Sequence, residues 1–457
     1  MTRWFDLCRG VWFVVSILLM AQPLCAQTQP PGRPYRGLFG GDATTQRRLH
    51  ELDLTLVVNG AADNGLVAPA DVNPLTSATE IREFEEMYSA SAELGYARRG
   101  RRVSVDARGS STVPYYSLYP DSATALSYGA NANLTYTFGT STLNAFGSYL
   151  FSPYYSMTPG AIAGPGPAAP VFDFVSAPNP NQLASAGASW ARRFSRRSSL
   201  SVSYSADGTL FVDQGQSTRG QGVRVSQDLQ ISRSLNLRGS YAYRQAEYAT
   251  SALATTPTPI PTPTPNPTTR WHDIDVGFGY VHLGARGRTT SLTASLGASI
   301  VDDGLRQNTG WRGSVHGDQA IGTNWTVGGD YSRALQAYGG LQEPVWVDFV
   351  GAMVGGRIGP RVSLSGGANY SAGEHLSLRG QAYSVYSGTA RMQVALNASV
   401  AVTVNYIYYR YDFPAGFDLP AGMPHLLDRQ RVQFGARFWL PLVRGGRASE
   451  PRLPIDQ

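Results

Sequence analysis

The chain contains no lysine, only two cysteines and few charged residues of either sign. Its 38 basic residues are all arginines, and charged residues make up 15% of the 457 positions, fewer than a soluble protein of this size normally carries. The arginines are scattered rather than gathered with aromatic residues in one stripe, which argues against nucleic acid as a partner. Both cysteines, Cys8 and Cys25, lie near the N-terminus.

Long apolar runs are also missing beyond the first residues. The run VWFVVSILLMA at 11–21 follows two arginines and has the length of an export signal, which is too short to span a bilayer comfortably. We expect residues 1–26 to be a cleaved signal peptide, so that the mature chain has no disulfide or thiol chemistry. Residues 27–48, rich in Pro and Gly, are expected to form a flexible tail. No later segment has the run of a transmembrane helix, so a mature protein in a membrane would cross it with strands.

The pattern that the sequence does contain is strict alternation. In SLSVSYSADG at 199–208, small or apolar residues occupy every second position, with serines and an aspartate between them. A period of two indicates an extended strand with two different faces. The pattern recurs at 131–139, 291–300 and 361–370. It predicts about eighteen strands, or about sixteen if two weak segments, 49–59 and 311–319, are not strands.

The connections between these segments alternate between short and long. Short ones, such as 98–102 and 138–142, carry the residues of hairpin turns, whereas 152–181 and 413–425 are long and irregular. One long connection contains TTPTPIPTPTPNPTT at 255–269, a composition typical of an extended spacer without a core. We interpret it as a tolerated expansion of an exposed loop, with a surface stalk as the alternative.

Strand length and closure decide between a soluble and a membrane fold. The alternating segments run for roughly 10 to 14 residues, the length of tilted membrane-spanning strands rather than of the shorter strands of soluble sheets. So many strands leave no free edge only if the sheet closes, and at that number the interior becomes a water-filled lumen. Apolar faces would then contact lipid and polar faces would line the lumen. Aromatic residues near segment ends fit an interfacial girdle: Phe138, Trp190, Phe194, Trp325, Phe438 and Trp439.

The C-terminal segments VTVNYIYYRYDF at 402–413 and DRQRVQFGARFWL at 428–440 resemble the last two strands of bacterial outer-membrane β-barrels of the putative porin type. The resemblance covers residues 49–440 and implies an all-β fold, a transmembrane antiparallel up-and-down β-barrel with short periplasmic turns and long extracellular loops. It places the protein in the outer membrane, with 27–48 in the periplasm and 441–457 as a polar C-terminal tail.

Ten charged residues lie at positions that we expect to face the lumen. Because both signs occur among them, they predict a pore lining with opposed basic and acidic walls rather than strong selectivity for anions. These pore-lining candidates are Arg224, Asp228, Arg238, Arg244, Arg312, Asp318, Asp330, Asp348, Arg391 and Arg437.

Catalytic and metal chemistry have little support in the sequence. No two of the six histidines have a close ligand spacing, and no phosphate-binding motif follows a strand and opens a helix. In WRGSVHGD at 311–318, His316 shares a face with Arg312, Ser314 and Asp318, which we interpret as lumen polarity rather than as a hydrolase site. We therefore predict no catalytic residues, no cofactor, no metal site and no enzyme activity.

The leading hypothesis is a passive channel for small hydrophilic solutes. Its expected partners are outer-membrane lipid and lipopolysaccharide, the barrel assembly machinery and small polar solutes, with a homo-oligomer as a further option. One alternative is a barrel component of an exopolysaccharide export or envelope-assembly system, and another is a barrel enzyme or surface adhesin. The tail at 27–48 is too short for the plug domain of a TonB-type transporter.

Overall fold

The computed structural model describes a set of segments that together make up most of the expected barrel. They are residues 48–64, 85–116, 126–153, 155–157, 172–174, 180–212, 217–249, 268–284, 289–304, 306–322, 324–337, 344–376, 381–414 and 425–447. The expected signal peptide at 1–26, almost all of the tail at 27–48 and most of the Pro/Thr-rich stretch at 255–269 lie outside these residues. The described residues contain no helix that is long and apolar enough to cross a membrane.

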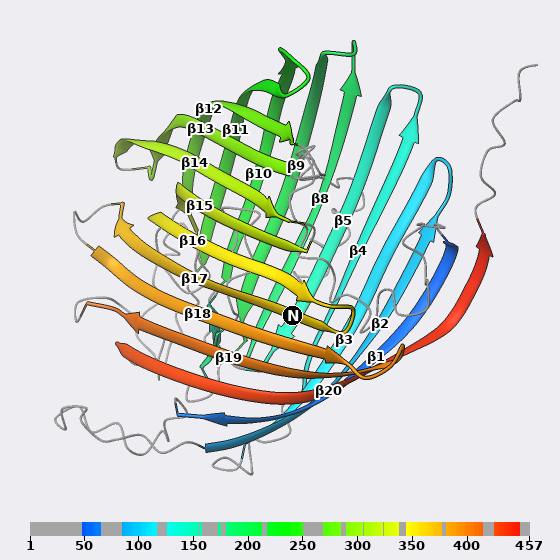
Figure 1. Ribbon diagram of the computed structural model, residues 1–457. Coiled ribbons are helices and arrows are strands. Elements are labelled where there is room, and N and C mark those ends of the chain that lie inside the picture. Colours follow the sequence, from blue (N-terminus) through cyan, green and yellow to red (C-terminus); the bar gives the residue numbers. More distant parts are fainter. Residues whose placement is uncertain are drawn as a thin grey trace, which may run out of the picture.

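The described strands form one closed sheet of eighteen strands (Figure 1). Each strand pairs antiparallel with the next one along the chain, and β1 pairs with β20, so the wall has no free edge. This confirms the predicted up-and-down β-barrel and its strand number. The strands are β1 (Arg48–Asp63), β2 (Glu85–Arg99), β3 (Val103–Tyr116), β4 (Ser127–Phe138), β5 (Ser141–Ser152), β8 (Asn181–Arg193), β9 (Ser198–Phe211), β10 (Ser217–Gln230), β11 (Leu235–Ala249), β12 (Thr268–Leu283), β13 (Thr289–Asp302), β14 (Gln307–Ile321), β15 (Trp325–Gln336), β16 (Val345–Ile358), β17 (Val362–His375), β18 (Gln381–Ala395), β19 (Val400–Asp412) and β20 (Leu426–Arg447).

Two further strands, β6 (Tyr155–Met157) and β7 (Phe172–Phe174), pair only with each other. They belong to the connection between β5 and β8, which the sequence predicts to be long and irregular. Both weak segments of the sequence are strands of the wall, the first within β1 and the second within β14. The last strand is longer than expected, because β20 continues past Leu440 and pairs with β1 as far as Arg447.

Short turns join the strands at one end of the barrel, here called the turn end; the opposite end is the loop end. Gly139 in the β4–β5 turn has φ +56° and Gly359 in the β16–β17 turn has φ +62°. This left-handed conformation is cheap for glycine alone, and it lets the strands reverse within a few residues. The glycines of the predicted hairpin turns therefore fix where these strands begin and end.

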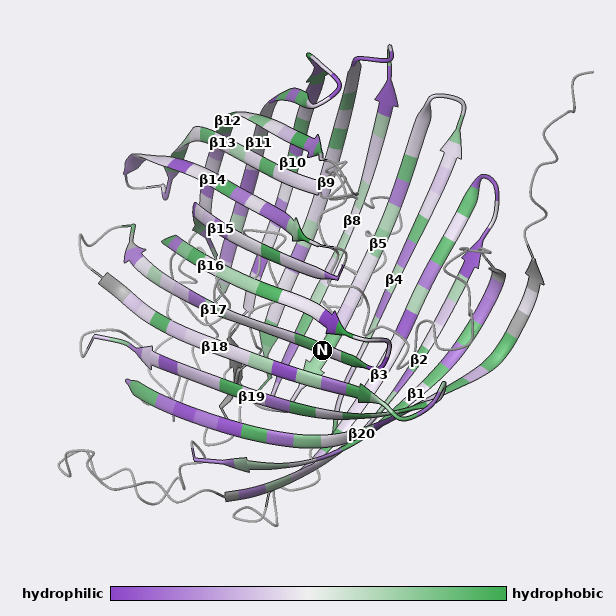
Figure 2. Ribbon diagram, viewed as in Figure 1, coloured by the Kyte–Doolittle hydropathy of each residue, from purple (hydrophilic) through white to green (hydrophobic). Residues whose placement is uncertain are grey.

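Hydrophobic and hydrophilic residues alternate along many strands (Figure 2). Because successive side chains point to opposite faces of a strand, the two faces of the wall differ in chemistry. On β12, for example, Ile274, Val276 and Phe278 are exposed on one face. The residues opposite them on β11 and β13 share this face, and exposed apolar residues are among them. Five of the six predicted girdle aromatics lie on this apolar face near the turn end. The exception is Trp439, which lies on the other face and is buried.

Candidate functional site

The polar face of the sheet is the concave face that surrounds the lumen. One cavity is lined jointly by residues from six successive strands, β20, β1, β2, β3, β4 and β5, and every strand contributes from its polar face. Only the inside of a closed barrel brings such residues around one space. The exposed apolar face is consequently the outside, and a closed barrel with an apolar exterior satisfies its backbone groups within the membrane. This is the architecture of a transmembrane β-barrel.

Serine hydroxyls form much of the inner surface. Ser201 and Ser226 of β9 and β10 lie 2.7 Å apart, oxygen to oxygen. Ser295 and Ser314 of β13 and β14 are paired in the same way at 2.8 Å. Because a hydroxyl both donates and accepts hydrogen bonds, such rows suit the wall of an aqueous channel. The serines of 199–208 accordingly face the lumen, as the alternation predicts.

The densest charge in the lumen lies halfway along β10 to β14. Arg224 donates to Asp275 at 3.0 Å, and Arg244 lies 3.5 Å from Asp273. Arg312 of β14 pairs with both aspartates, its Nε lying 3.1 Å from the carboxylate of Asp275. Three predicted lumen arginines therefore meet on two carboxylates that the sequence interpretation missed, although both alternate with Ile274 in the pattern of an inward-facing row.

A second group of predicted residues lies toward the turn end. Arg238 pairs with Asp228 of the neighbouring strand at 2.7 Å, and His316 bonds Asp318 on its own strand at 2.7 Å. Asp330 stands opposite His316 in the register of β14 and β15. These side chains share the lumen face. Arg238 and Asp228 neutralise each other, whereas Asp318 and Asp330 place two carboxylates beside the single imidazole of His316.

Arg391 and Arg437 lie on the opposite wall, on β18 and β20. Among the described residues, the Nε atoms of both arginines are buried and make no hydrogen bond. Neither arginine forms a close ion pair with another residue that the structure describes, and Glu93 is the carboxylate whose charge acts on Arg437. Both side chains are on the lumen face. They give this wall a basic character that the β10–β14 wall lacks.

Asp348 is placed differently from the other nine candidates. It shares the outer face of β16 with Val350, which is exposed, and it pairs with Arg333 and accepts a hydrogen bond from Tyr331 at 2.8 Å. Those two partners come from the outer face of β15. The reason is local: apolar residues flank Asp348 on both faces of β16, so the sequence around it does not fix which side is inward.

The junction between the first and last strands holds a buried charge cluster that sequence analysis missed. Asp63 at the end of β1 is fully buried. Its carboxylate accepts hydrogen bonds from the Nε atoms of Arg429 and Arg431, each at 2.7 Å. Arg429 also donates to the Tyr409 hydroxyl at 2.6 Å. Asp63 and Arg429 are 366 positions apart in the sequence, so no local sequence pattern predicts their contact.

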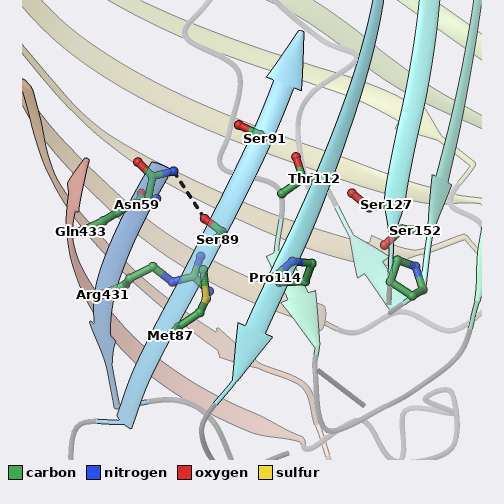
Figure 3. Close-up of a pocket in the computed structure, with 11 residues that line it drawn as sticks. Asn59, Met87, Ser89, Ser91, Thr112, Pro114, Ser127, Ser152, Arg431 and Gln433 are labelled. Atoms are coloured by element: carbon green, nitrogen blue, oxygen red, sulfur yellow. Dashed lines mark hydrogen bonds between the residues drawn. The ribbon is translucent and has the colours of Figure 1, made fainter. Parts of the chain in front are cut away.

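Next to this cluster, the lumen wall is hollowed into a recess with a cavity volume of about 250 Å³ (Figure 3). Its lining combines hydroxyl and amide side chains, and Asn59 donates to Ser89 across it at 3.4 Å. The recess lies in the loop-end half of the barrel. No cluster of three metal-ligating side chains occurs among the described residues.

No protein-family model and no curated protein matches the chain. Among solved structures it is similar to OccAB3 of Acinetobacter baumannii, with 10% identity over 86% of this chain and 99% of that chain and a TM-score of 0.44. It is also similar to OpdQ of Pseudomonas aeruginosa, with 10% identity over 86% and 98% and a TM-score of 0.44. A third similar structure is Pseudomonas aeruginosa OccK2 (OpdF) in complex with glucuronate, with 8% identity over 86% and 98% and a TM-score of 0.44.

Proposed function

We propose that this barrel is a passive outer-membrane channel for small hydrophilic solutes. The observation that carries the proposal is the inner wall, where hydroxyl groups and mutually paired charges follow one another around the barrel. An eighteen-stranded barrel is too wide for such side chains to fill. Water and dissolved solutes occupy the remaining space.

The balance of lumen charge supports modest rather than strong ion selectivity. On the β10–β14 wall, Arg224, Arg244 and Arg312 face Asp273 and Asp275, so the field there is that of closely spaced opposite charges. Such a wall favours dipolar and polar solutes over one sign of ion. We include the nine inward-facing candidate residues in this lining and leave out Asp348.

We further propose that lipid and lipopolysaccharide cover the outer face and that the assembly machinery of outer-membrane barrels inserts the chain. The many apolar residues exposed on the outer face support the first, and the closed strand order, which requires β1 and β20 to meet after synthesis, supports the second. A homo-oligomer stays a prediction.

Single-channel recording tests the function. The mature protein, extracted in detergent, is inserted into a planar bilayer, and current is recorded under a salt gradient. We expect stable conductance steps and a reversal potential close to zero. The absence of current from protein that is demonstrably folded and inserted would contradict the proposal. It would favour a role in export or adhesion instead.

A further inference from the structure

The recess beside the β1–β20 junction has the chemistry of a binding site. Hydroxyl groups of Ser89, Ser91 and Thr112 line it together with the amide groups of Asn59 and Gln433. Figure 3 shows Asn59, Ser89, Ser91 and Thr112 on successive strands around the space. Because each hydroxyl and each amide can both donate and accept, the lining matches a ligand whose own groups do both.

Several of these groups are available to a ligand. Within the described part of the chain, the hydroxyls of Ser91, Thr112 and Ser127 make no hydrogen bond to other side chains or to the backbone. The bond between Asn59 and Ser89 is long, at 3.4 Å, so exchanging it for a bond to a ligand costs little. In the free channel, these groups are satisfied by water.

Most of the recess lining is uncharged, which favours an uncharged, hydrogen-bonding ligand. Arg431 is the single charged residue among the eleven that line the recess, and its guanidinium is held by the buried carboxylate of Asp63 at 2.7 Å. Asp63 is shared with Arg429, so it offsets only part of the charge of Arg431, whose side chain is 15% exposed. This weakens the attraction of Arg431 for an anion without removing it. Hydroxyl and amide groups make up the rest of the polar lining.

Size and apolar contact narrow the ligand class further. The cavity volume of about 250 Å³ lies below the roughly 300–1,000 Å³ of sites for drug-sized ligands, so the recess holds a single small ring. Met87 and Pro114 give it an apolar side, against which the C–H face of a ring can pack. A hexose combines a ring of this size with hydroxyl groups around its rim.

We propose that the recess binds one neutral, polyhydroxylated solute of monosaccharide size on its way through the lumen. This inference rests on the proposed channel function and adds a solute class to it. The recess lies in the loop-end half, so a solute that enters from the side of the long loops meets it before the charged middle of the barrel.

Binding is tested with D-glucose and the full mature chain folded in detergent, by a saturation-transfer NMR titration that does not require an open channel. The test variant is Ser91→Ala with Thr112→Val, which removes two hydroxyls at nearly constant volume. The matched control is Thr389→Val on the lumen face of β18, a partly exposed threonine outside the recess.

We expect saturable glucose binding to the wild type and to the control. The dissociation constant should rise roughly three- to tenfold for each hydroxyl removed from the recess. The absence of saturable binding to folded wild-type protein would overturn the inference. So would an equal loss of affinity in the Thr389→Val control, or binding of glucuronic acid without binding of glucose.

Conductance of the same preparations separates this inference from the channel function. A conducting channel that does not bind glucose overturns the recess proposal and leaves the channel intact. A protein that binds glucose but carries no current supports the recess and contradicts the channel.

Discussion

Asp63 shows how one side chain secures the junction of the barrel. Its carboxylate is fully buried and bonded to Arg429 and Arg431. Replacing it by asparagine leaves two guanidinium groups without their counter-charge, and removing one partner of a buried pair typically costs about 3–5 kcal/mol. We expect Asp63→Asn to lower the free energy of unfolding by about this amount, as measured by denaturant titration of the folded barrel.

Asp106→Asn is the matched control for this prediction. Asp106 lies on the lumen face of β3, is partly exposed, and has no ion pair with another described residue. Its substitution should change the free energy of unfolding by less than about 0.5 kcal/mol. Equal effects of the two substitutions would show that the cluster does not stabilise the junction.

The elements β10 to β14 act together through the charges on their lumen face. Asp275 binds Arg224 of β10 and Arg312 of β14, so Asp275→Asn leaves excess positive charge in the middle of the lumen. We expect the reversal potential in a salt gradient to shift toward anion preference. Asp348→Asn, which removes an equal charge from the outer face, should leave it unchanged; a shift of the same size in both variants would contradict the assignment of faces.

The ladder between β14 and β15 is the least complete in the wall. It begins at Gly313 although β14 itself begins at Gln307. At this gap, Arg333 lies over the rings of Trp311 and Trp346, 5.1 and 5.6 Å from their centroids. Trp346 also packs into a buried apolar cluster with Trp271 and Leu335, and its ring lies against Gly310 in the unpaired part of β14.

Trp346→Ala should therefore open this part of the wall. Truncating a buried tryptophan costs about 3–5 kcal/mol, and we expect faster amide hydrogen exchange in residues 307–312, measured by mass spectrometry. Trp190→Ala on β8, where the ladders on both sides are complete, is the control. Unchanged exchange in 307–312 would mean that backbone pairing alone holds the gap closed.

At the scale of the whole molecule, stability depends on closure. Because β1 pairs with both β2 and β20, deleting residues 48–63 leaves two unpaired strand edges. Lipid cannot hydrogen-bond the backbone N–H and C=O groups of these edges. We expect this deletion to abolish the compact, detergent-resistant form that a folded barrel gives on unheated gels.

Deleting 256–266 from the Pro/Thr-rich connection should preserve that form and the conductance, since this composition forms no core. Loss of the barrel in both deletions would contradict the second expectation.

Much of this architecture could be predicted from single segments. Alternation identifies Leu200 and Ser201 as residues of opposite faces, and turn glycines such as Gly139 mark the reversals. These are local properties, set by the period of a strand and by backbone geometry. Asp348 marks the limit of local reasoning, because apolar residues on both sides of its strand leave the direction of its side chain open.

The sequence by itself indicated about eighteen strands, with sixteen left open, and it determined the chemistry of the two faces and the need for closure. An alternating chain of this length has no other way to pair its backbone in lipid. Only the tertiary structure decided which side chains meet. The contact of Asp63 with Arg429, the sharing of Asp273 and Asp275 among three arginines, and the recess all join residues from different strands. Their positions follow from the register and curvature of the closed wall, which no single strand encodes.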